Sequence, residues 1–507
     1  MSILTAEPTD TVAAEQRQPL APQPTHTYRA VVIGSGFGGQ AAAIALRERG
    51  IEDFVILERR PFLGGTWSQN VYPGAAVDVP SPLYSLAGDP FDWSQMYAEQ
   101  DELERYTEFC LTKHGLREKA VTGATVVEVR WTGEVWEVRT EEQGTFRGQF
   151  LINASGPLSQ PVIPPFPGLD TFAGPSFHTN CWDESVDLRG KRVAVVGSGA
   201  SAAQVIPSIQ PEVAELHVFQ RTPHWVMARP DRHFRWWERR LMRIPAVNRA
   251  VRTAIYLKLE TRVIGFKYSP LLLKLVAERE ARKLLERQVA DPDLRARLTP
   301  NYTIGCKRIV LSSTLYPALC AENATLHDRT DAIDHLDETG IVTTKGTHVD
   351  LDVIVWATGY DATDGVVSYP VIGTGGRTVG DAWSDFPRAY LGTTIPGFPN
   401  LFVITGPNTG IGHTSAVFLI ESQMQYVMNA IETVLTAGAT SVEVTAEAED
   451  RYTSMIHREL KRTVWVTGGC HSWYQSKDGH VIAMFPGFSF TFRRWTGHFR
   501  PADHIIR

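Results

Sequence analysis

Two glycine-rich turns in this 507-residue sequence have the residue types and spacing that bind dinucleotide phosphates. The first places glycines at Gly34, Gly36 and Gly39, directly after an apolar run. In this pattern one glycine permits a tight turn, the next lets the backbone approach a pyrophosphate, and the last allows close helix–strand packing. The following helix would direct free N–H groups toward the phosphates. Glu58, predicted to end the next strand, could accept hydrogen bonds from ribose hydroxyls.

The second turn contains Gly197, Gly199 and Ser201, and the strand that follows it ends at Arg221 instead of at an acid. A carboxylate there would repel a 2′-phosphate, whereas a guanidinium can bind it with two hydrogen bonds. The sequence therefore predicts NADPH at the second turn and an adenine dinucleotide without that phosphate at the first. A solvated surface charge is the ordinary alternative for Arg221.

Two dinucleotide sites in one chain indicate a flavoenzyme that takes hydride from NADPH. A strand at 353–357 ends in Ala-Thr-Gly, which would let the chain pass close to a bound cofactor, and residues 153–156 repeat this ending in a shorter form. A flavin disulfide reductase would also bind both cofactors. That alternative requires a CxxxxC pair near the first turn, and the sequence has none there.

Strand–turn–helix–strand units must position these motifs, and the apolar pattern predicts them. The first unit is expected at 28–58, and the second begins at 192. We therefore predict an α/β fold with two Rossmann-like dinucleotide-binding domains and an inserted helical subdomain. The predicted boundaries are a disordered N-terminal tail at 1–26, an FAD-binding domain at 27–160 and 390–507, an NADPH-binding domain at 161–230 and 301–389, and the helical insertion at 231–300. From 470 onward we expect loops and short strands.

The composition is that of a globular protein, with 43% apolar and 21% charged residues and a net charge of -6. This charge does not favour a nucleic-acid partner, and no apolar run is long enough to span a bilayer. The N-terminus lacks the pattern of a secretory signal. Five scattered cysteines without a CxxC pair argue against a disulfide framework, a zinc site and a dithiol redox centre, so no metal is predicted and a reducing cytoplasm is expected.

Two further motifs carry a family resemblance. Residues 172–183 read FAGPSFHTNCWD, which resembles the FxGxxxHxxxW(P/D) fingerprint of type I Baeyer–Villiger monooxygenases. Residues 64–67 read GGTW, and together with YPG at 72–74 and Asp78 they look like a second signature of that family. The resemblance covers nearly the whole chain from about residue 28.

The resemblance implies roles for individual residues. Arg308 matches the active-site arginine of the family, Asp78 would orient it, and Lys307 would join Arg221 near the 2′-phosphate. The resemblance links His178 to domain movement. It also implies that Trp473 contacts the nicotinamide cofactor. Three residues of the GGTW motif are assigned to cofactor binding: Gly65, Thr66 and Trp67. Without the resemblance, Arg308 would be a solvated charge, Asp78 a turn residue, His178 a structural histidine and Trp473 a core residue.

The implied activity is that of an FAD- and NADPH-dependent monooxygenase. In the family a flavin C4a-peroxide, formed from O2, inserts one oxygen atom next to a ketone carbonyl and gives an ester or lactone. The alternative is an N- or S-oxygenating flavin monooxygenase that acts on amines or sulfides through the C4a-hydroperoxide. The expected partners are therefore a small ketone, or a sulfide or amine, and O2. A non-catalytic nucleotide-binding protein is disfavoured, because the sequence has the family's residue type at every catalytic position.

The basic and aromatic stretch at 232–262 has two interpretations. It could be a helix that lies on a membrane surface. The preferred interpretation is an inserted helical subdomain with a solvated basic face, because the family that the chain resembles has an insertion at this place.

Overall fold

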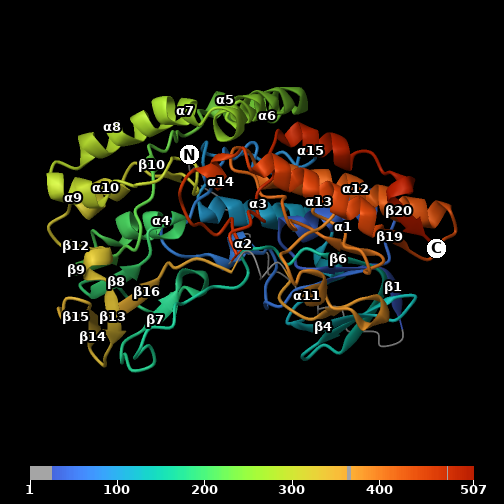
Figure 1. The fold of residues 1–507 in the computed structure, drawn as a ribbon, viewed down its shortest axis with the longest axis horizontal. Helices are drawn as coiled ribbons and strands as arrows, with labels where there is room; N and C mark the ends of the chain where they lie inside the picture. The colour runs from blue at the N-terminus through green and yellow to red at the C-terminus, as the bar shows by residue number, and fades with distance from the viewer. Residues whose placement is uncertain (1–25, 362–366, 477) are drawn as a thin grey trace, which may run out of the picture.

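The computed structural model describes residues 26–361, 367–476 and 478–507 (Figure 1). The N-terminal tail predicted at 1–26 lies outside the described residues except for its last one. Two sheets with parallel central strands lie at the lower left and the lower right of the view, and helices cover them (Figure 1). An α/β fold with two dinucleotide-binding sheets is therefore confirmed.

The first sheet contains the first glycine turn. Its central strands β1 (Thr27–Ile33), β2 (Phe54–Leu57) and β6 (Thr145–Asn153) run parallel. All four residues of β2 are buried, as expected for a strand covered on both faces. Within the described residues this sheet has eight strands, in the order β17 (Val371–Ile372), β4 (Val126–Trp131), β5 (Trp136–Thr140), β6, β1, β2 and β3 (Ala120–Val121), with β18 (Leu401–Val403) paired to β6.

Helices α1 (Phe37–Glu48) and α12 (Ala416–Thr436) pack against each other over this sheet. The small residues of α1, including Ala41, Ala42 and Ala43, are buried, which lets the helix approach the sheet closely. Because β18 and α12 come from the last quarter of the chain, the sheet of the first glycine turn and the helices over it combine separated segments.

The second sheet is parallel throughout its described strands and contains the second glycine turn. Helix α4 (Ala200–Ile209) follows that turn, and α10 (Leu315–Leu319) packs beside it. The strand order is β12 (Ala324–His327), β9 (Glu215–Phe219), β8 (Arg192–Val196), β16 (Val353–Trp356) and β7 (Ser176–His178). An antiparallel sheet adjoins it, formed by β13 (Ile333–Leu336), β14 (Gly340–Thr343) and β15 (His348–Asp350).

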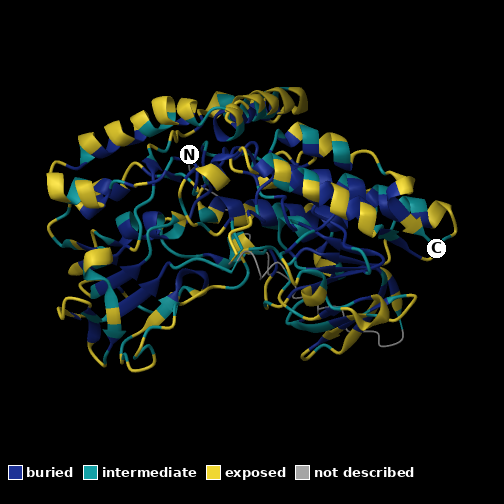
Figure 2. Cartoon of the chain, viewed as in Figure 1, coloured by how far each residue is buried: buried dark blue, intermediate teal, exposed yellow. Residues whose placement is uncertain are grey.

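The inserted segment is helical, as expected, and forms a band along the upper edge of the view (Figure 1). Much of its outer surface is exposed, whereas the two sheets beneath are largely buried (Figure 2). Its elements are α5 (Trp236–Met242), α6 (Pro245–Glu260), a π-helical turn at Ile264–Tyr268, α7 (Pro270–Leu272), a second π-helical turn at Leu273–Glu278, α8 (Arg279–Gln288) and α9 (Pro292–Arg297). None of the described helices combines the length and apolar character that crossing a bilayer requires.

Two expectations about the C-terminal half need correction. The region from 470 onward does contain a short strand, β20 (His504–Ile506), but it also forms the helix α15 (Ser489–Thr496). Its aromatic residues have low helix propensity, and packing of the fully buried Phe492 overrides that preference. Strand β17 pairs with β4 of the first sheet, although it falls inside the segment 301–389 assigned to the NADPH-binding domain. The domain boundaries otherwise stay a prediction.

Candidate active site

The first glycine turn is shaped by backbone contacts that only glycine permits. A Cβ on Gly39 would lie 1.8 Å from the carbonyl oxygen of Gly34, and one on Gly34 would lie 2.5 Å from that of Ala154. Gly34 also has a φ of +100°, which other residues rarely adopt. The GGTW motif lies directly beside this turn, because a Cβ on Gly65 would be 2.6 Å from Cα of Gly36. Thr66 and Trp67 begin the next short helix, α2 (Thr66–Gln69).

Glu58 lies buried at the end of β2, beside the turn. The backbone N–H and the hydroxyl of Ser35 both donate to one of its carboxylate oxygens, at 3.0 and 2.7 Å. The backbone N–H of Arg60 donates to the other oxygen at 3.0 Å. These bonds fix the carboxylate where a ribose would lie in a Rossmann fold. Ser35 is a supporting residue that sequence reasoning did not single out.

The second turn has the same construction. Gly197 has a φ of +138°, and a Cβ there would lie 2.3 Å from the carbonyl oxygen of Ala357. Around Gly199 there is open space, since no heavy atom lies within 4 Å of a Cβ built on it. Ser201, in the first turn of α4, accepts a hydrogen bond from the Tyr72 hydroxyl at 3.3 Å. A hollow lined in part by Gly197, Ser198 and His224 adjoins this turn.

Arg221 follows strand β9 and is exposed, close to the Lys307 side chain. Burial and the neighbouring Arg221 charge both lower the pKa of Lys307. Two cations held near each other at the end of a nucleotide-binding strand form a site that suits a dianion. The structure therefore brings together the two residues that were predicted to meet a 2′-phosphate.

Arg308 and Asp78 form a bidentate ion pair, although 230 positions separate them in the sequence. Nε and Nη2 of Arg308 donate to the two carboxylate oxygens, each at 2.5 Å. The Asp78 carboxylate raises the pKa of Arg308, and although burial opposes ionisation of Asp78, the guanidinium holds the pKa of that carboxyl below its usual range. The Arg308 side chain is still 43% exposed, so its other N–H groups can meet a ligand.

Asp78 lies on a loop that touches both glycine turns. This loop begins at α2, beside the first turn. The side chain of Gln204, on α4 after the second turn, donates to the carbonyl oxygen of Ala76 at 2.8 Å. The Tyr72 hydroxyl donates to the side-chain oxygen of Gln204 at 2.9 Å. The Arg308–Asp78 pair therefore lies where the two nucleotide-binding units meet.

Two tyrosines that sequence reasoning did not assign lie in the electrostatic field of this ion pair. Burial raises the pKa of Tyr84 and of Tyr474 to about 12, and charges on Arg308 and Asp78 also act on both hydroxyls. Trp67 of the GGTW motif donates to the Tyr84 hydroxyl at 3.3 Å. Both phenols therefore stay protonated at neutral pH, and the motif tryptophan positions one of them.

His178 is buried at the end of β7, where its Nδ1 accepts the backbone N–H of Asn180 at 3.0 Å. The fingerprint segment binds to the GGTW helix, because Gln69 donates to the carbonyl oxygen of Asn180 at 2.6 Å. The Asn180 amide also donates to the Tyr360 hydroxyl, which donates to Asn70 at 3.0 Å. The segment thus links the two sheets, while a part for His178 in their movement stays a prediction.

The buried histidines predict a pH dependence of stability. Burial lowers the pKa of His178 to about 4, and that of His224 to about 4 as well. The unfolded chain therefore binds more protons between about pH 6.5 and pH 4, so stability falls as the pH drops through this window. We expect the melting temperature of His178→Gln to fall less over this range than that of the wild type.

Thermal melts from pH 7 to pH 4.5 measure this difference, which amounts to at most about 3 kcal/mol for one group. The half-buried His335→Gln variant serves as the control and should behave like the wild type. Identical pH profiles for His178→Gln and the wild type would contradict the assignment.

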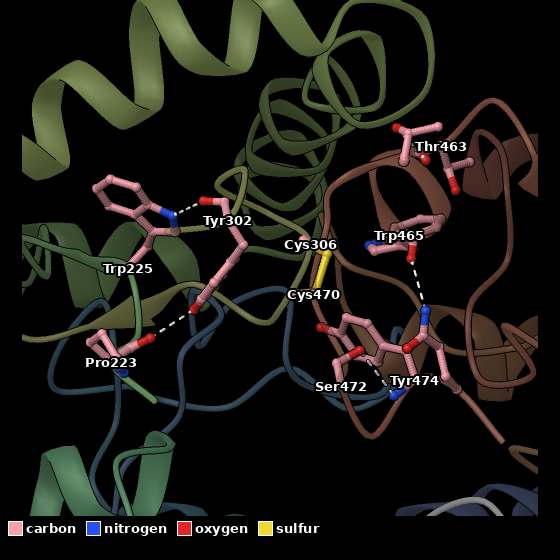
Figure 3. Close-up of a disulfide and its surroundings, with 11 residues drawn as sticks. Pro223, Trp225, Tyr302, Cys306, Thr463, Trp465, Cys470, Ser472 and Tyr474 are labelled. Atoms are coloured by element: carbon pink, nitrogen blue, oxygen red, sulfur yellow. Dashed lines mark hydrogen bonds between the residues drawn. A yellow bond between two sulfur atoms is a disulfide. The ribbon is translucent and has the colours of Figure 1, made fainter. Parts of the chain in front are cut away.

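Cys306 and Cys470 form a disulfide, a pairing that the scattered cysteines did not predict (Figure 3). The two residues are 164 positions apart, and only the fold brings them together. The bond joins the segment of Arg308 to the loop that carries Ser472 and Tyr474 (Figure 3). Trp473, on the same loop, is 42% exposed and lies against Tyr474, with ring centroids 4.5 Å apart. Among the described cysteines, Cys110, Cys181 and Cys320 are free.

Two sheets with parallel central strands, each with a dinucleotide turn, and an ion pair where the two units meet define a pyridine-nucleotide-dependent flavoprotein oxidoreductase. The family model described as pyridine nucleotide-disulphide oxidoreductase matches residues 31–256. A Baeyer–Villiger monooxygenase of Pseudomonas aeruginosa is 42% identical over 93% of this chain and 90% of its own length. One of Streptomyces coelicolor is also 42% identical, over 94% of this chain and 92% of its own length.

Solved structures agree with these relatives. An oxidised steroid monooxygenase bound to NADP has a TM-score of 0.85 at 30% identity and covers 95% of this chain and 99% of its own. A cyclohexanone monooxygenase from Rhodococcus sp. bound to NADP+ has a TM-score of 0.86 at 26% identity, with the same coverage of both chains. This chain belongs to the Baeyer–Villiger monooxygenase family. It is an FAD- and NADPH-dependent enzyme that inserts one oxygen atom next to a carbonyl group, as the sequence predicted.

Proposed function

We propose that Arg308 is the catalytic residue of this oxygen insertion, that Asp78 positions it, and that a ketone and O2 are the substrates. The observation that carries the proposal is the bidentate Arg308–Asp78 pair at the junction of the two nucleotide-binding units. It fixes a permanent positive charge and leaves part of the guanidinium exposed. The product would be an ester or lactone.

The first glycine turn fits FAD. A Cβ on Gly34 or Gly39 would collide with backbone of this turn or its surroundings, and a Cβ on Gly65 would collide with Gly36. This leaves backbone N–H groups to meet a pyrophosphate, with the Glu58 carboxylate held for the ribose. When bound, FAD supplies the redox centre that accepts hydride from NADPH and reacts with O2.

The protein's own residues determine the chemistry around that centre. The N–H groups of Arg308 that Asp78 does not use can stabilise negative charge on the oxygen atom being transferred. Partly buried Tyr84 and buried Tyr474 lie in the electrostatic field of the pair and would limit the access of water once the cofactors are bound. In a site with little water a fixed charge stabilises an anion more strongly than it would in solvent. Trp473, beside Tyr474, would contact the nicotinamide cofactor.

The proposal is tested with a panel of linear, cyclic and aromatic ketones and one sulfide. The purified protein should be yellow, and NADPH should bleach it. Ketones should then be converted to esters or lactones, with one NADPH consumed for each product molecule. NADPH consumption without any oxygenated product from the whole panel would contradict the assignment.

Nucleotide preference gives a separate prediction. Arg221→Ala should weaken NADPH binding by about 1.5–3 kcal/mol, or roughly 10- to 150-fold, because a hydrogen bond to a charged group is lost. NADH binding should change little, since NADH lacks the 2′-phosphate. Dissociation constants for both nucleotides measure the effect, and Arg189→Ala, whose exposed arginine pairs with Asp187, is the control. An unchanged NADPH/NADH ratio would remove Arg221 from the site.

A cytoplasmic location is part of the proposal and needs its own test. Structural disulfides are rare in reducing compartments, so the redox state of the Cys306–Cys470 pair in the cell bears directly on this location. Rapid alkylation of thiols in intact cells, followed by mass spectrometry, reports whether the pair is oxidised there. Fractionation of the same cells places the enzyme.

A further inference from the structure

The helical band from Arg235 to Val276 is largely exposed (Figure 2), and many of its exposed side chains are large and apolar. Among the residues that the structure describes, eleven of the twenty exposed large apolar side chains lie in this band. Trp236 is 77% exposed, Leu271 is 64% exposed and Leu275 is 62% exposed. Scattered exposed leucines need no explanation, but a concentration of this kind marks an interaction surface.

The exposed apolar residues recur along the band. Leu257 lies in the last turn of α6, Ile264 and Tyr268 lie in the first π-helical turn, and Leu271 and Leu275 lie in α7 and the second π-helical turn. All five are exposed, and we call them the apolar stripe. Ser269 interrupts the helix between Tyr268 and Leu271, and exposed apolar residues are found on both sides of this break.

The opposite side of the band is packed on the rest of the protein. Phe266 and Leu273 are buried in a cluster with residues of the C-terminal segment. Arg252 donates to the carbonyl oxygen of Pro82 at 2.8 Å and to the Ser85 hydroxyl at 2.9 Å. One side of the band is thus packed against the core, whereas the residues of the stripe are exposed to solvent.

Basic side chains accompany the stripe. The band contains ten lysines and arginines and only two acidic residues, in a chain whose net charge is -6. One acid, Glu260, is buried and binds Ser489, and the other, Glu238, pairs with Arg232. Four of the ten cations pair with acids outside the band: Arg239 and Arg243 with Asp92, Arg252 with Glu421, and Lys267 with Glu459. Exposed members of the basic set for which no ion pair is found among the described residues include Arg240, Lys258 and Lys274. We call the exposed side of residues 235–276 the basic–apolar face.

We propose that the basic–apolar face docks on an anionic lipid bilayer, with its helices in the plane of the membrane. Tryptophan and leucine on one side and lysine and arginine beside them are the features that hold such helices at an interface. Each cation near the surface would add to the attraction. A second copy of the chain fits less well, because a two-fold contact would bring two strongly positive faces together. The exposed apolar stripe thus favours the membrane interpretation over a merely solvated basic face.

The test is sedimentation of the FAD-loaded enzyme with vesicles of phosphatidylcholine, with and without phosphatidylserine. We expect binding to the vesicles that contain phosphatidylserine, weaker binding to phosphatidylcholine alone, and release by added salt. Leu271→Ser/Leu275→Ser and Arg240→Gln/Lys258→Gln/Lys274→Gln should each bind at least about tenfold more weakly. Matched changes elsewhere on the surface, Leu435→Ser and Lys345→Gln, should bind like the wild type.

All variants should keep the wild-type rate of NADPH-dependent flavin reduction without vesicles, because none of these residues lies in the proposed active site. Equal sedimentation with both kinds of vesicle, or unchanged binding by both multiple variants, would overturn the proposal. The proposal would also fail if the wild type did not bind vesicles and analytical ultracentrifugation showed instead a dimer that dissociates in the same variants.

Discussion

Replacement of Arg308 by alanine is expected to abolish ester or lactone formation while NADPH still bleaches the flavin. Loss of a preorganised charge at the reacting oxygen typically costs about 10²–10³-fold in rate, and here the only guanidinium bonded to Asp78 in the described structure is removed. Hydride transfer does not require that charge. NADPH consumption should therefore continue, with hydrogen peroxide in place of the oxygenated product.

Two further variants separate charge from geometry. Arg308→Lys keeps a cation but cannot span both oxygens of Asp78, so we expect partial activity at best. Asp78→Asn keeps the shape and removes the partner charge, so it should lower product yield more than it lowers flavin reduction. The exposed Arg189→Ala variant is the control. A wild-type ester yield from Arg308→Ala would exclude Arg308 from the mechanism.

The sequence predicted the sheets because their signals are local. Strand β2 is an uninterrupted buried run that ends at Glu58, and β9 likewise ends just before Arg221. Glycines 34, 39 and 197 occupy positions that backbone contacts deny to any other residue, so their spacing carries structural information. The pairing of Arg308 with Asp78 has no local signal, and it was reached only through the resemblance to a family.

What the sequence did not predict depends on contacts between distant segments. Nothing in the sequence distinguishes Tyr84 from the other tyrosines. Only the fold places its hydroxyl beside Trp67 and in the electrostatic field of Arg308. Ser35 lies between two glycines of the motif, and the sequence gives no sign that its hydroxyl donates a hydrogen bond to Glu58. Helix α15 forms because Phe492 is buried, not because its residues favour a helix. In each case tertiary packing decides the outcome.

The disulfide is the clearest case, because spacing within the sequence cannot reveal a pair separated by 164 residues. Its location gives the second large prediction. Cys306 lies two residues before Arg308, and Cys470 lies three residues before Trp473. The backbone of Gly468 packs so tightly on Cys306 that a Cβ there would lie 2.8 Å from the sulfur. The bond therefore fastens the proposed catalytic segment to the loop that would contact the nicotinamide cofactor.

Cys306→Ser/Cys470→Ser should lower the stability of this region by about 2–5 kcal/mol, the usual cost of losing a native disulfide. It should also lower the ester yield per NADPH consumed, because the loop would close over Arg308 less often. Thermal melts with and without dithiothreitol measure the first effect. The wild type should shift on reduction, whereas the double variant should not, and Cys320→Ser, which removes an exposed free thiol, should follow the wild type.

The second effect distinguishes a structural brace from a link that positions the active site. Thr303 also donates to the carbonyl oxygen of Gly468 at 3.0 Å, so the two segments keep one contact when the sulfurs separate. If the bond only stabilises the fold, the double variant assayed well below its melting temperature will couple NADPH to ester formation as the wild type does. If the bond positions Arg308 against the cofactor loop, coupling will fall even at low temperature, while the dissociation constant for NADPH changes by less.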